Sequence, residues 1–139
     1  MVIFVLDASA VIRFLDGEPG VHEVTEMFLN AVRGQCRLLI SAVNWGEIAG
    51  KLHKKHGKDK AQEYLHRLLA KGLEVVPATA QRAESAAIIA SDHRIPYADS
   101  FGVELASDST DHVLVTADFD VKPVEGQIKI VFLPVKPKP

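Results

Sequence analysis

The stretch Val2-Ile3-Phe4-Val5-Leu6-Asp7 begins the chain with five consecutive apolar residues and ends on an acid. A continuous apolar run, rather than one that alternates with polar residues, is typical of a strand buried on both faces of a parallel sheet. The run is far shorter than the ~20 residues that a membrane-spanning helix needs. We therefore predict a buried strand at Val2–Leu6 that is followed directly by a carboxylate.

Further strands and helices alternate along the chain. Short apolar runs rich in β-branched residues predict the other strands, at Leu38–Ile40, Leu73–Val76, Val113–Thr116 and Ile128–Phe132. Apolar residues at helical spacing predict helices at Ser9–Leu15, Val21–Val32, Trp45–His56, Lys60–Leu69, Thr79–Ser91 and Tyr97–Ala106, with a loop at Ser41–Asn44. This alternation favours an α/β fold with a central, mostly parallel sheet of four to five strands and helices on both faces.

Length and composition favour one globular domain. The chain has 139 residues, of which 47% are hydrophobic and 24% charged, values that exclude a disordered chain, a collagen-like fibre and a coiled coil. We predict a single domain over residues 1–134 and a tail over residues 135–139, where Pro and Lys alternate. No positively charged segment precedes the first strand, and Cys36 is the only cysteine. We therefore expect no secretory signal, no internal disulfide, no membrane partner and a cytoplasmic location.

Four acidic residues on separate elements are expected at one edge of this sheet. Asp7 and Asp118 each follow a predicted strand, and Asp120 comes two residues after the second of them. Glu47 and Asp99 lie near the starts of two predicted helices. The carboxyl ends of parallel strands meet at the edge where ligands bind in such folds. Taken singly, each acid has another explanation, namely helix capping, a turn or the helix dipole.

Carboxylates gathered in one place repel one another, and a cation relieves that repulsion. An all-oxygen donor set without a thiolate is typical of Mg²⁺ or Mn²⁺. The sequence therefore predicts a divalent metal site. It leaves open whether one or two ions bind, and whether Asp92 or Asp120 joins the site.

Four short segments, taken in order, resemble the PIN-domain nucleases, and among them the VapC toxins of toxin–antitoxin pairs. The segments are Asp7-Ala8-Ser9-Ala10, Val43-Asn44-Trp45-Gly46-Glu47, Ala98-Asp99-Ser100 and Thr116-Ala117-Asp118. Their order and spacing cover almost the whole chain. The resemblance implies a PIN-like three-layer α/β/α fold in which the catalytic acids that hold Mg²⁺ or Mn²⁺ are Asp7, Glu47, Asp99 and Asp118. It also implies that Ser9, Asn44 and Thr116 support these acids, and that Asp120 supplements the last of them.

The same resemblance implies an activity and partners. It implies a metal-dependent endoribonuclease that hydrolyses RNA phosphodiester bonds, with an ion activating a water for in-line attack and stabilising the leaving oxygen. It further implies a homodimer that is silenced by a cognate antitoxin protein.

The distribution of charge is compatible with RNA, although the formal net charge is only −2. Without the four site acids, 14 of the 18 acidic residues remain, against 16 Lys and Arg. A basic stretch beyond Glu47 is predicted to contact RNA through Lys51, Lys54, Lys55 and Lys58. The alternative is a solvated helix end that its dipole favours.

Three other functions stay open at this stage. The first is a PIN-domain nuclease of RNA processing that has no antitoxin. The second is a catalytically silent PIN-like module that binds RNA or protein, which the presence of all four acids disfavours. The third is a receiver-like phosphate-binding regulator, which would have a pair of acids after the first strand where this chain has Asp7 alone.

Overall fold

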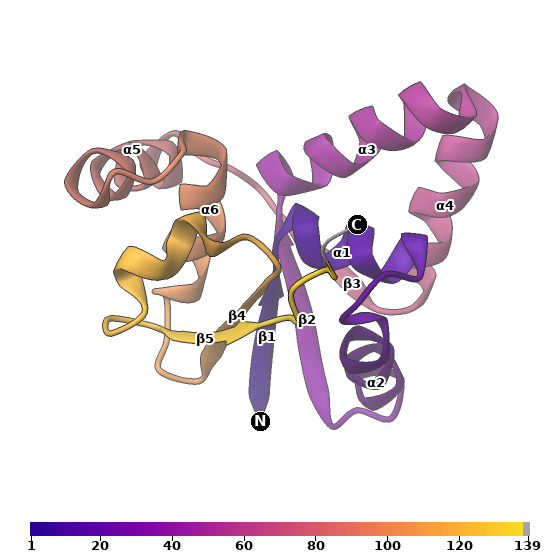
Figure 1. The fold of residues 1–139 in the computed structure, drawn as a ribbon, viewed down its shortest axis with the longest axis horizontal. Coiled ribbons are helices and arrows are strands. Elements are labelled where there is room, and N and C mark those ends of the chain that lie inside the picture. Colours follow the sequence, from indigo (N-terminus) through magenta and orange to yellow (C-terminus); the bar gives the residue numbers. More distant parts are fainter. Residues whose placement is uncertain (138–139) are drawn as a thin grey trace.

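Five parallel strands form one central sheet in the computed structural model, which describes residues 1–137 (Figure 1). The strands are β1 (Val2–Leu6), β2 (Cys36–Ser41), β3 (Leu73–Val76), β4 (His112–Thr116) and β5 (Lys129–Phe132). Their order across the sheet is β3-β2-β1-β4-β5, and every neighbouring pair is parallel. The predicted, mostly parallel sheet is thus confirmed, with β1 at its centre.

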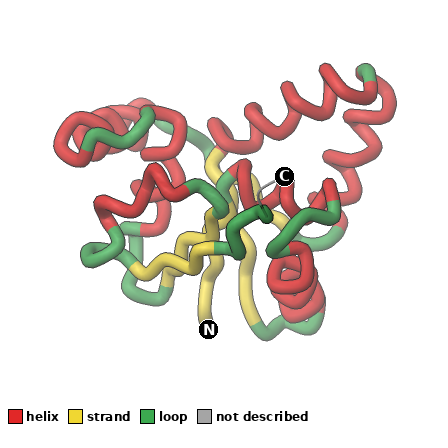
Figure 2. The backbone as a smooth tube through the Cα atoms, in the orientation of Figure 1, coloured by secondary structure: helices red, strands yellow, loops and turns green. Residues whose placement is uncertain are grey.

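Helices pack on both faces of the sheet. They are α1 (Ala8–Asp16), α2 (Val21–Val32), α3 (Ala42–His56), α4 (Lys58–Ala70), α5 (Ala80–His93), α6 (Tyr97–Ala106) and a 3-10 helix, η1 (Phe119–Val124). Figure 2 shows the strands in the middle of the molecule with helices to either side. Among residues 1–137, no helix combines the length and the apolar character that crossing a membrane requires.

Neighbouring residues of the central strands contribute to two separate apolar cores. Val5 and Leu39 pack with α6 and η1, whereas Leu6 and Ile40 pack with α1 to α4. Val5, Leu6 and Ile40 have no exposed surface at all. Burial on both faces is the reason that the strands read as continuous apolar runs. Each such side chain contributes roughly 1.5–3 kcal/mol when it is removed from water.

The start of α3 differs from the sequence prediction. We expected a loop at Ser41–Asn44, but β2 ends at Ser41 and α3 begins at Ala42. Ser41 caps this helix, because its Oγ accepts a hydrogen bond from the amide of Val43 at 3.2 Å. The prediction of a loop was wrong because a serine before a helix is as typical of a cap as of a loop. As a result, Asn44 and Glu47 lie in the first two turns of α3.

The connection between β4 and β5 also contains an element that was not predicted. Here η1 runs over six residues and includes Pro123. Its first turn is capped by Asp118, whose Oδ1 accepts a hydrogen bond from the amide of Asp120 at 2.9 Å. A helix this short has too few residues to display a helical period in its sequence.

The segment after β5 packs against the start of α2. Leu133 is 1% exposed and lies against Gly20. The guanidinium of Arg13 donates hydrogen bonds to the carbonyl oxygens of Pro19, at 2.6 Å, and Pro134, at 2.8 Å. Lys136, in the predicted tail, pairs with Glu18. Residues 138 and 139 of that tail lie outside the described residues.

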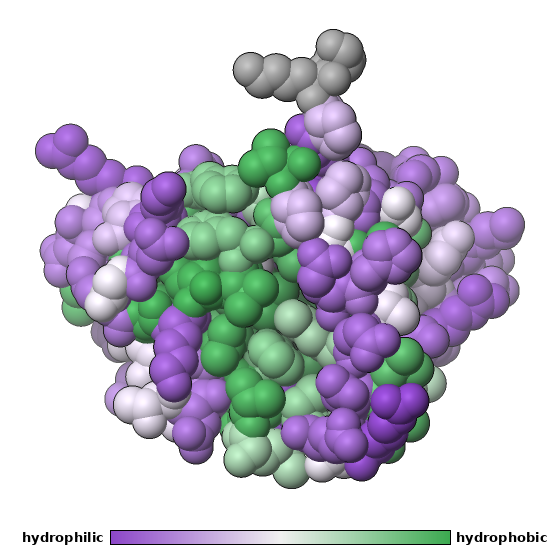
Figure 3. All heavy atoms as spheres, turned by 60° about the horizontal axis from the view of Figure 1, so that its bottom comes forward, coloured by the Kyte–Doolittle hydropathy of each residue, from purple (hydrophilic) through white to green (hydrophobic). Residues whose placement is uncertain are grey.

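Apolar side chains also gather on the surface. Figure 3 shows them in the middle of the face that this view presents, bordered by polar side chains. The exposed hydrophobic residues of the chain include Val131 in β5 and Val135 after it. Exposed apolar surface that is contiguous marks sites of interaction with other molecules.

The packing of Gly20 against Leu133 predicts a clear effect on stability. Gly20 has a φ of 102°, and a Cβ at this position would lie 3.0 Å from two Leu133 side-chain carbons. We expect Gly20→Ala to lower the free energy of unfolding by about 1–3 kcal/mol, from backbone strain and overpacking. Urea denaturation followed by circular dichroism measures this change.

Gly50→Ala is the matched control. Gly50 lies in α3, where nothing occupies the space that its Cβ would take. This variant should gain up to ~1 kcal/mol from helix propensity. Equal stabilities for the two variants would contradict the proposed packing of the segment after β5.

Candidate metal centre

The site lies where the direction of chain connection changes in the sheet. β1 has β2 on one side and β4 on the other, so the order reverses at the β1–β4 boundary. Asp7 follows β1, and Asp118 comes two residues after β4 ends. In open α/β sheets such a reversal leaves a crevice at the carboxyl edge, where ligands bind.

Asp7 is buried and tightly held. Its side chain accepts hydrogen bonds from the Ser9 hydroxyl at 2.6 Å, from the Ala10 amide at 3.0 Å and from the Thr116 hydroxyl. Burial raises the pKa of this carboxyl, the hydrogen bonds oppose that rise, and the charge of Asp118 adds to it. The bond to Ala10 makes Asp7 the N-cap of α1. The side chain of Asp7 therefore both caps α1 and lies at the candidate metal site.

Ser9 and Thr116 connect Asp7 to the chain after β4. The Ser9 hydroxyl accepts a hydrogen bond from the amide of Ala117 at 2.8 Å. The Thr116 hydroxyl accepts one from the amide of Asp118 at 2.9 Å. Two predicted supporting residues thus lie between the acids and orient the segment that carries Asp118.

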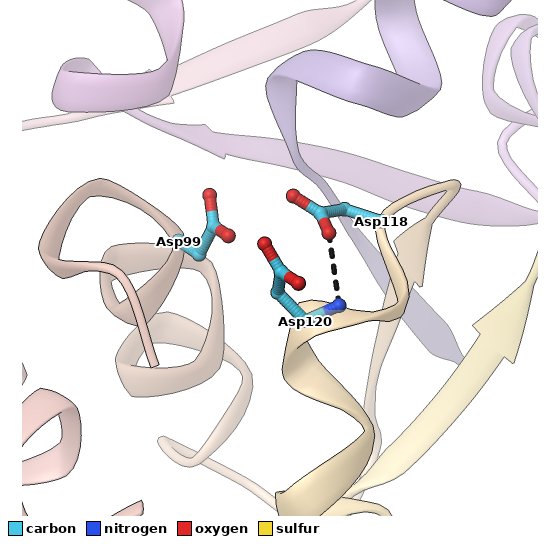
Figure 4. Close-up of side chains that lie close together, drawn as sticks. All are labelled: Asp99, Asp118 and Asp120. Atoms are coloured by element: carbon cyan, nitrogen blue, oxygen red, sulfur yellow. Dashed lines mark hydrogen bonds between the residues drawn. The ribbon is translucent and has the colours of Figure 1, made fainter. Parts of the chain in front are cut away.

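Three carboxylates point toward one another at this edge. Asp99 comes from the first turn of α6, whereas Asp118 and Asp120 come from the start of η1 (Figure 4). One carboxylate oxygen from each of the three lies within 4.8 Å of the others. Asp120, which the sequence analysis treated as a supplement, is therefore part of the cluster.

The negative charges in the cluster affect Asp99 most strongly. Burial, contact with Asp118 and the charges of Asp7 and Glu47 together raise the pKa of Asp99 to about 7, and burial is the largest of these causes. All four predicted acids are thus close enough to interact. A cation placed among them would favour the ionised form of Asp99, against burial and against the repulsion of the other acids.

Asn44 links the two helices that carry Glu47 and Asp99. Its Nδ2 donates to Glu47 Oε1 at 2.9 Å and to the carbonyl oxygen of Ala98 at 3.1 Å. Asn44 is 1% exposed, and its Oδ1 has no hydrogen-bond partner among the described residues. A Cβ at Gly102 would lie 3.6 Å from this Oδ1 and 3.7 Å from Asp7 Cβ. It would also lie 3.2 Å from Leu114 Cδ1 on β4, which is tighter than ordinary contact, so the glycine lets α6 lie close to the sheet.

The donor set fits a hard divalent cation. Asp99, Asp118 and Asp120 supply carboxylate oxygens only, as Mg²⁺ and Mn²⁺ favour. Among the described residues, the cluster within 4.8 Å does not include Asp7 or Glu47, so their roles as ligands stay predictions. Asp92, the other acid that the sequence left open, is exposed on α5 and is not part of this cluster.

A groove of about 330 Å³ adjoins the acids. Its lining includes Ser9, Asp118, Lys51, Phe119 and Lys136. Phe119 and Lys136 were not predicted as site residues. A single Phe is more typical of a core, and Lys136 belonged to the predicted tail. A larger cavity of about 570 Å³ lies by His93 and His112 and contains none of the four predicted acids.

The four predicted RNA-binding lysines occupy different positions. Lys51 lines the groove. Lys54 and Lys58 are exposed near the turn between α3 and α4, and Lys55 lies 3.5 Å from Asp16. Contact of the last three with RNA stays a prediction.

Known proteins share this architecture. The PIN domain family matches residues 4–126 of the chain. A search of curated protein sequences finds no match.

Several solved structures superpose over nearly the full length. A chain of DNA-bound VapBC from Salmonella typhimurium gives a TM-score of 0.73 at 21% identity, covering 95% of this chain and 98% of that chain. A chain of DNA-bound VapBC2 from Rickettsia felis gives a TM-score of 0.70 at 16% identity, covering 95% of this chain and 99% of that chain. VapC20 from Mycobacterium tuberculosis, a sarcin-ricin loop cleaving toxin, gives a TM-score of 0.63 at 16% identity, covering 96% of this chain and 99% of that chain. At these identities the likeness concerns the fold, and the expected three-layer fold is confirmed.

The raised pKa of Asp99 leads to a pH-dependent stability in the absence of metal. The folded chain keeps a proton on Asp99 up to about pH 7, whereas the unfolded chain loses it near the ordinary value of 3.8. Stability from this group therefore falls as the pH rises between these values. We expect Asp99→Asn in EDTA to raise the melting temperature by on the order of a few degrees at pH 8, and by a smaller amount at pH 5.

Asp111→Asn is the control for this measurement, because Asp111 is exposed before β4, at the opposite edge of the sheet. It should leave the melting temperature unchanged at both pH values. Adding Mg²⁺ at pH 8 should stabilise the native chain more than Asp99→Asn. A constant difference between the native chain and Asp99→Asn from pH 5 to pH 8 would count against the environment described for Asp99.

Proposed function

Because this chain belongs to the PIN-domain family, we propose that it is a divalent-metal-dependent endoribonuclease that acts as the toxin of a toxin–antitoxin pair. The observation that carries the proposal is the convergence of Asp99, Asp118 and Asp120 at the carboxyl edge of the sheet. Within residues 1–137 none of these three carboxylates forms an ion pair with a basic side chain, and such a cluster suits a metal ion that binds a phosphate group.

The residues that would hold Mg²⁺ or Mn²⁺ are Asp99, Asp118 and Asp120, with Asp7 and Glu47 beside them. When bound, the metal supplies Lewis-acid stabilisation of the charge that develops on a phosphodiester and lowers the pKa of a water. The chain's own task is to hold the carboxylates in place. Asp7 is held from three directions, by Ser9, Ala10 and Thr116.

Glu47 fits a different task from the other acids. It is exposed, and Asn44 holds one of its carboxylate oxygens. Glu47 can therefore accept a hydrogen bond from the attacking water while Asn44 keeps its side chain oriented. Asp99, at the start of α6, completes the acidic set from the other face of the sheet.

Cleavage of RNA by the purified chain tests the proposal. We expect discrete cleavage of total cellular RNA with Mg²⁺ or Mn²⁺ and none with EDTA. Asp118→Asn keeps an oxygen that can cap η1 but loses the charge. We expect it to lower the cleavage rate by more than roughly 100-fold, since loss of a residue that merely supports a metal ligand costs 10–100-fold. Gel electrophoresis of the RNA over time measures the rate.

Asp111→Asn is again the matched carboxylate control and should cleave at the native rate. Cleavage that persists in EDTA, or in Asp118→Asn, would contradict the assignment of the metal site. A folded native chain that binds RNA but does not cleave it with either metal would favour the catalytically silent binding module.

The toxin role and the partners are part of the same proposal. The Klebsiella pneumoniae structure with this fold is described as a toxin–antitoxin complex, with a TM-score of 0.65 at 17% identity over 94% of this chain. The exposed apolar surface supports a protein partner or a second copy of the chain. We propose a cytoplasmic homodimer that a cognate antitoxin inhibits.

Growth of a bacterial host separates the toxin from an RNA-processing nuclease. We expect expression of the native chain to arrest growth, and co-expression of a small protein encoded beside its gene to restore it. Asp118→Asn should not arrest growth. Light scattering should give twice the chain mass of 15.2 kDa for the purified protein. Normal growth with a native chain that cleaves RNA in vitro would favour the processing nuclease.

A further inference from the structure

The groove beside the acids carries features that metal binding does not use. Its lining includes Ser9 and Asp118, at the site, together with Lys51 on α3 and Phe119 on η1. Glu18 and Lys136 also belong to the lining. The groove therefore offers space for a ligand next to the metal centre.

Lys51 provides positive charge next to the acids that is not neutralised within the protein. It comes four residues after Glu47 on α3, so the two side chains lie on the same face of the helix, one turn apart. Lys51 is exposed and forms no ion pair with any residue of the described part of the chain. An unpaired ammonium group beside a metal centre is suited to a phosphate of the substrate.

The other two cations of the groove are already engaged. Arg13 donates to the carbonyl oxygens of Pro19 and Pro134, and Lys136 pairs with Glu18. These contacts hold the segment after β5 in place. Lys51 is thus the cation of the groove that remains available to a ligand.

Phe119 provides an aromatic surface on the same groove. It directly follows Asp118, and 43% of its surface is exposed. One ring face stacks on Phe132, with centroids 4.8 Å apart and planes 11° apart. The stack on Phe132 fixes the orientation of the Phe119 ring. The part of the ring that stays exposed can stack with a nucleobase.

We propose that this groove binds the RNA strand next to the cleaved phosphodiester, with a backbone phosphate at Lys51 and a base stacked on Phe119. The inference rests on the proposed ribonuclease function. An RNA strand fits better than a protein segment, because the cation and the aromatic ring flank the metal centre, as phosphate and base flank a cleaved bond. Neither contact reads the identity of a base, so the groove contributes affinity rather than sequence specificity.

Binding of a fluorescein-labelled, mixed-sequence single-stranded RNA of about 12 nucleotides, a length within the usual range of site sizes, tests the groove. Anisotropy is measured with Ca²⁺ in place of Mg²⁺, in an Asp118→Asn parent that does not cleave. Phe119→Leu keeps an apolar side chain against Phe132 but removes the ring. We expect it to weaken binding by roughly tenfold, with the salt dependence unchanged. Phe119→Tyr should restore binding.

Lys51→Ala has a signature of its own. We expect it to lower the slope of log affinity against log salt concentration by about 0.7, the value for one phosphate contact on a single strand. Lys71→Ala is the charge-matched control, because Lys71 ends α4 just before β3, at the opposite edge of the sheet. It should leave both affinity and slope unchanged. Melting temperatures equal to that of the parent exclude misfolding as the cause.

Failure of this inference and failure of the proposed function are distinguishable. If the native chain cleaves RNA but Lys51→Ala and Phe119→Leu bind it like the parent, the groove assignment is wrong and the ribonuclease stands. If the two substitutions abolish inhibition by the antitoxin while RNA binding is unchanged, the groove belongs to a protein partner. If the native chain neither binds nor cleaves RNA with Mg²⁺ or Mn²⁺, both proposals fail.

Discussion

The buried carboxylate of Asp7 is the constraint on which the rest of the site depends. A buried charge costs several kcal/mol unless it is hydrogen-bonded, and each hydrogen bond to a charged group returns roughly 1.5–3 kcal/mol. Ser9, Ala10 and Thr116 supply three such bonds. To do so, the start of α1 and the end of β4 must meet at one point. The same contacts lead the chain after β4 to Asp118.

Repulsion among the acids opposes the stability that packing provides. Asp99 and Asp118 come from different elements and are held close by α6 and η1, whose apolar residues pack in the same core. Burial of Asp99, together with these neighbouring acids, raises its pKa to about 7. A fold tolerates such a cluster because the two cores are large and the unfavourable charge is confined to one edge. A cation bound at that edge would neutralise part of the negative charge and would stabilise the folded chain.

The fold was largely predictable because its sheet is buried on both faces. Continuous apolar runs such as Val2–Leu6 mark such strands directly, and all five predicted strands are present. The two differences between the predicted and the observed elements have local causes. Ser41 caps α3 where a loop was expected, and η1 is too short to show a helical period. Strand order did not follow from the sequence analysis, because it depends on which strands pair rather than on any one strand.

The sequence by itself determined the fold class and supplied the candidate acids, since residue type and position after a strand are local properties. Only the tertiary structure decided which acids converge. It brings Asp120 into contact with Asp99 and Asp118, and it separates Lys51, in the groove, from the other lysines of its stretch. It also places Phe119 at the surface beside the site. These outcomes depend on contacts between elements far apart in the chain, which no local pattern of residues records.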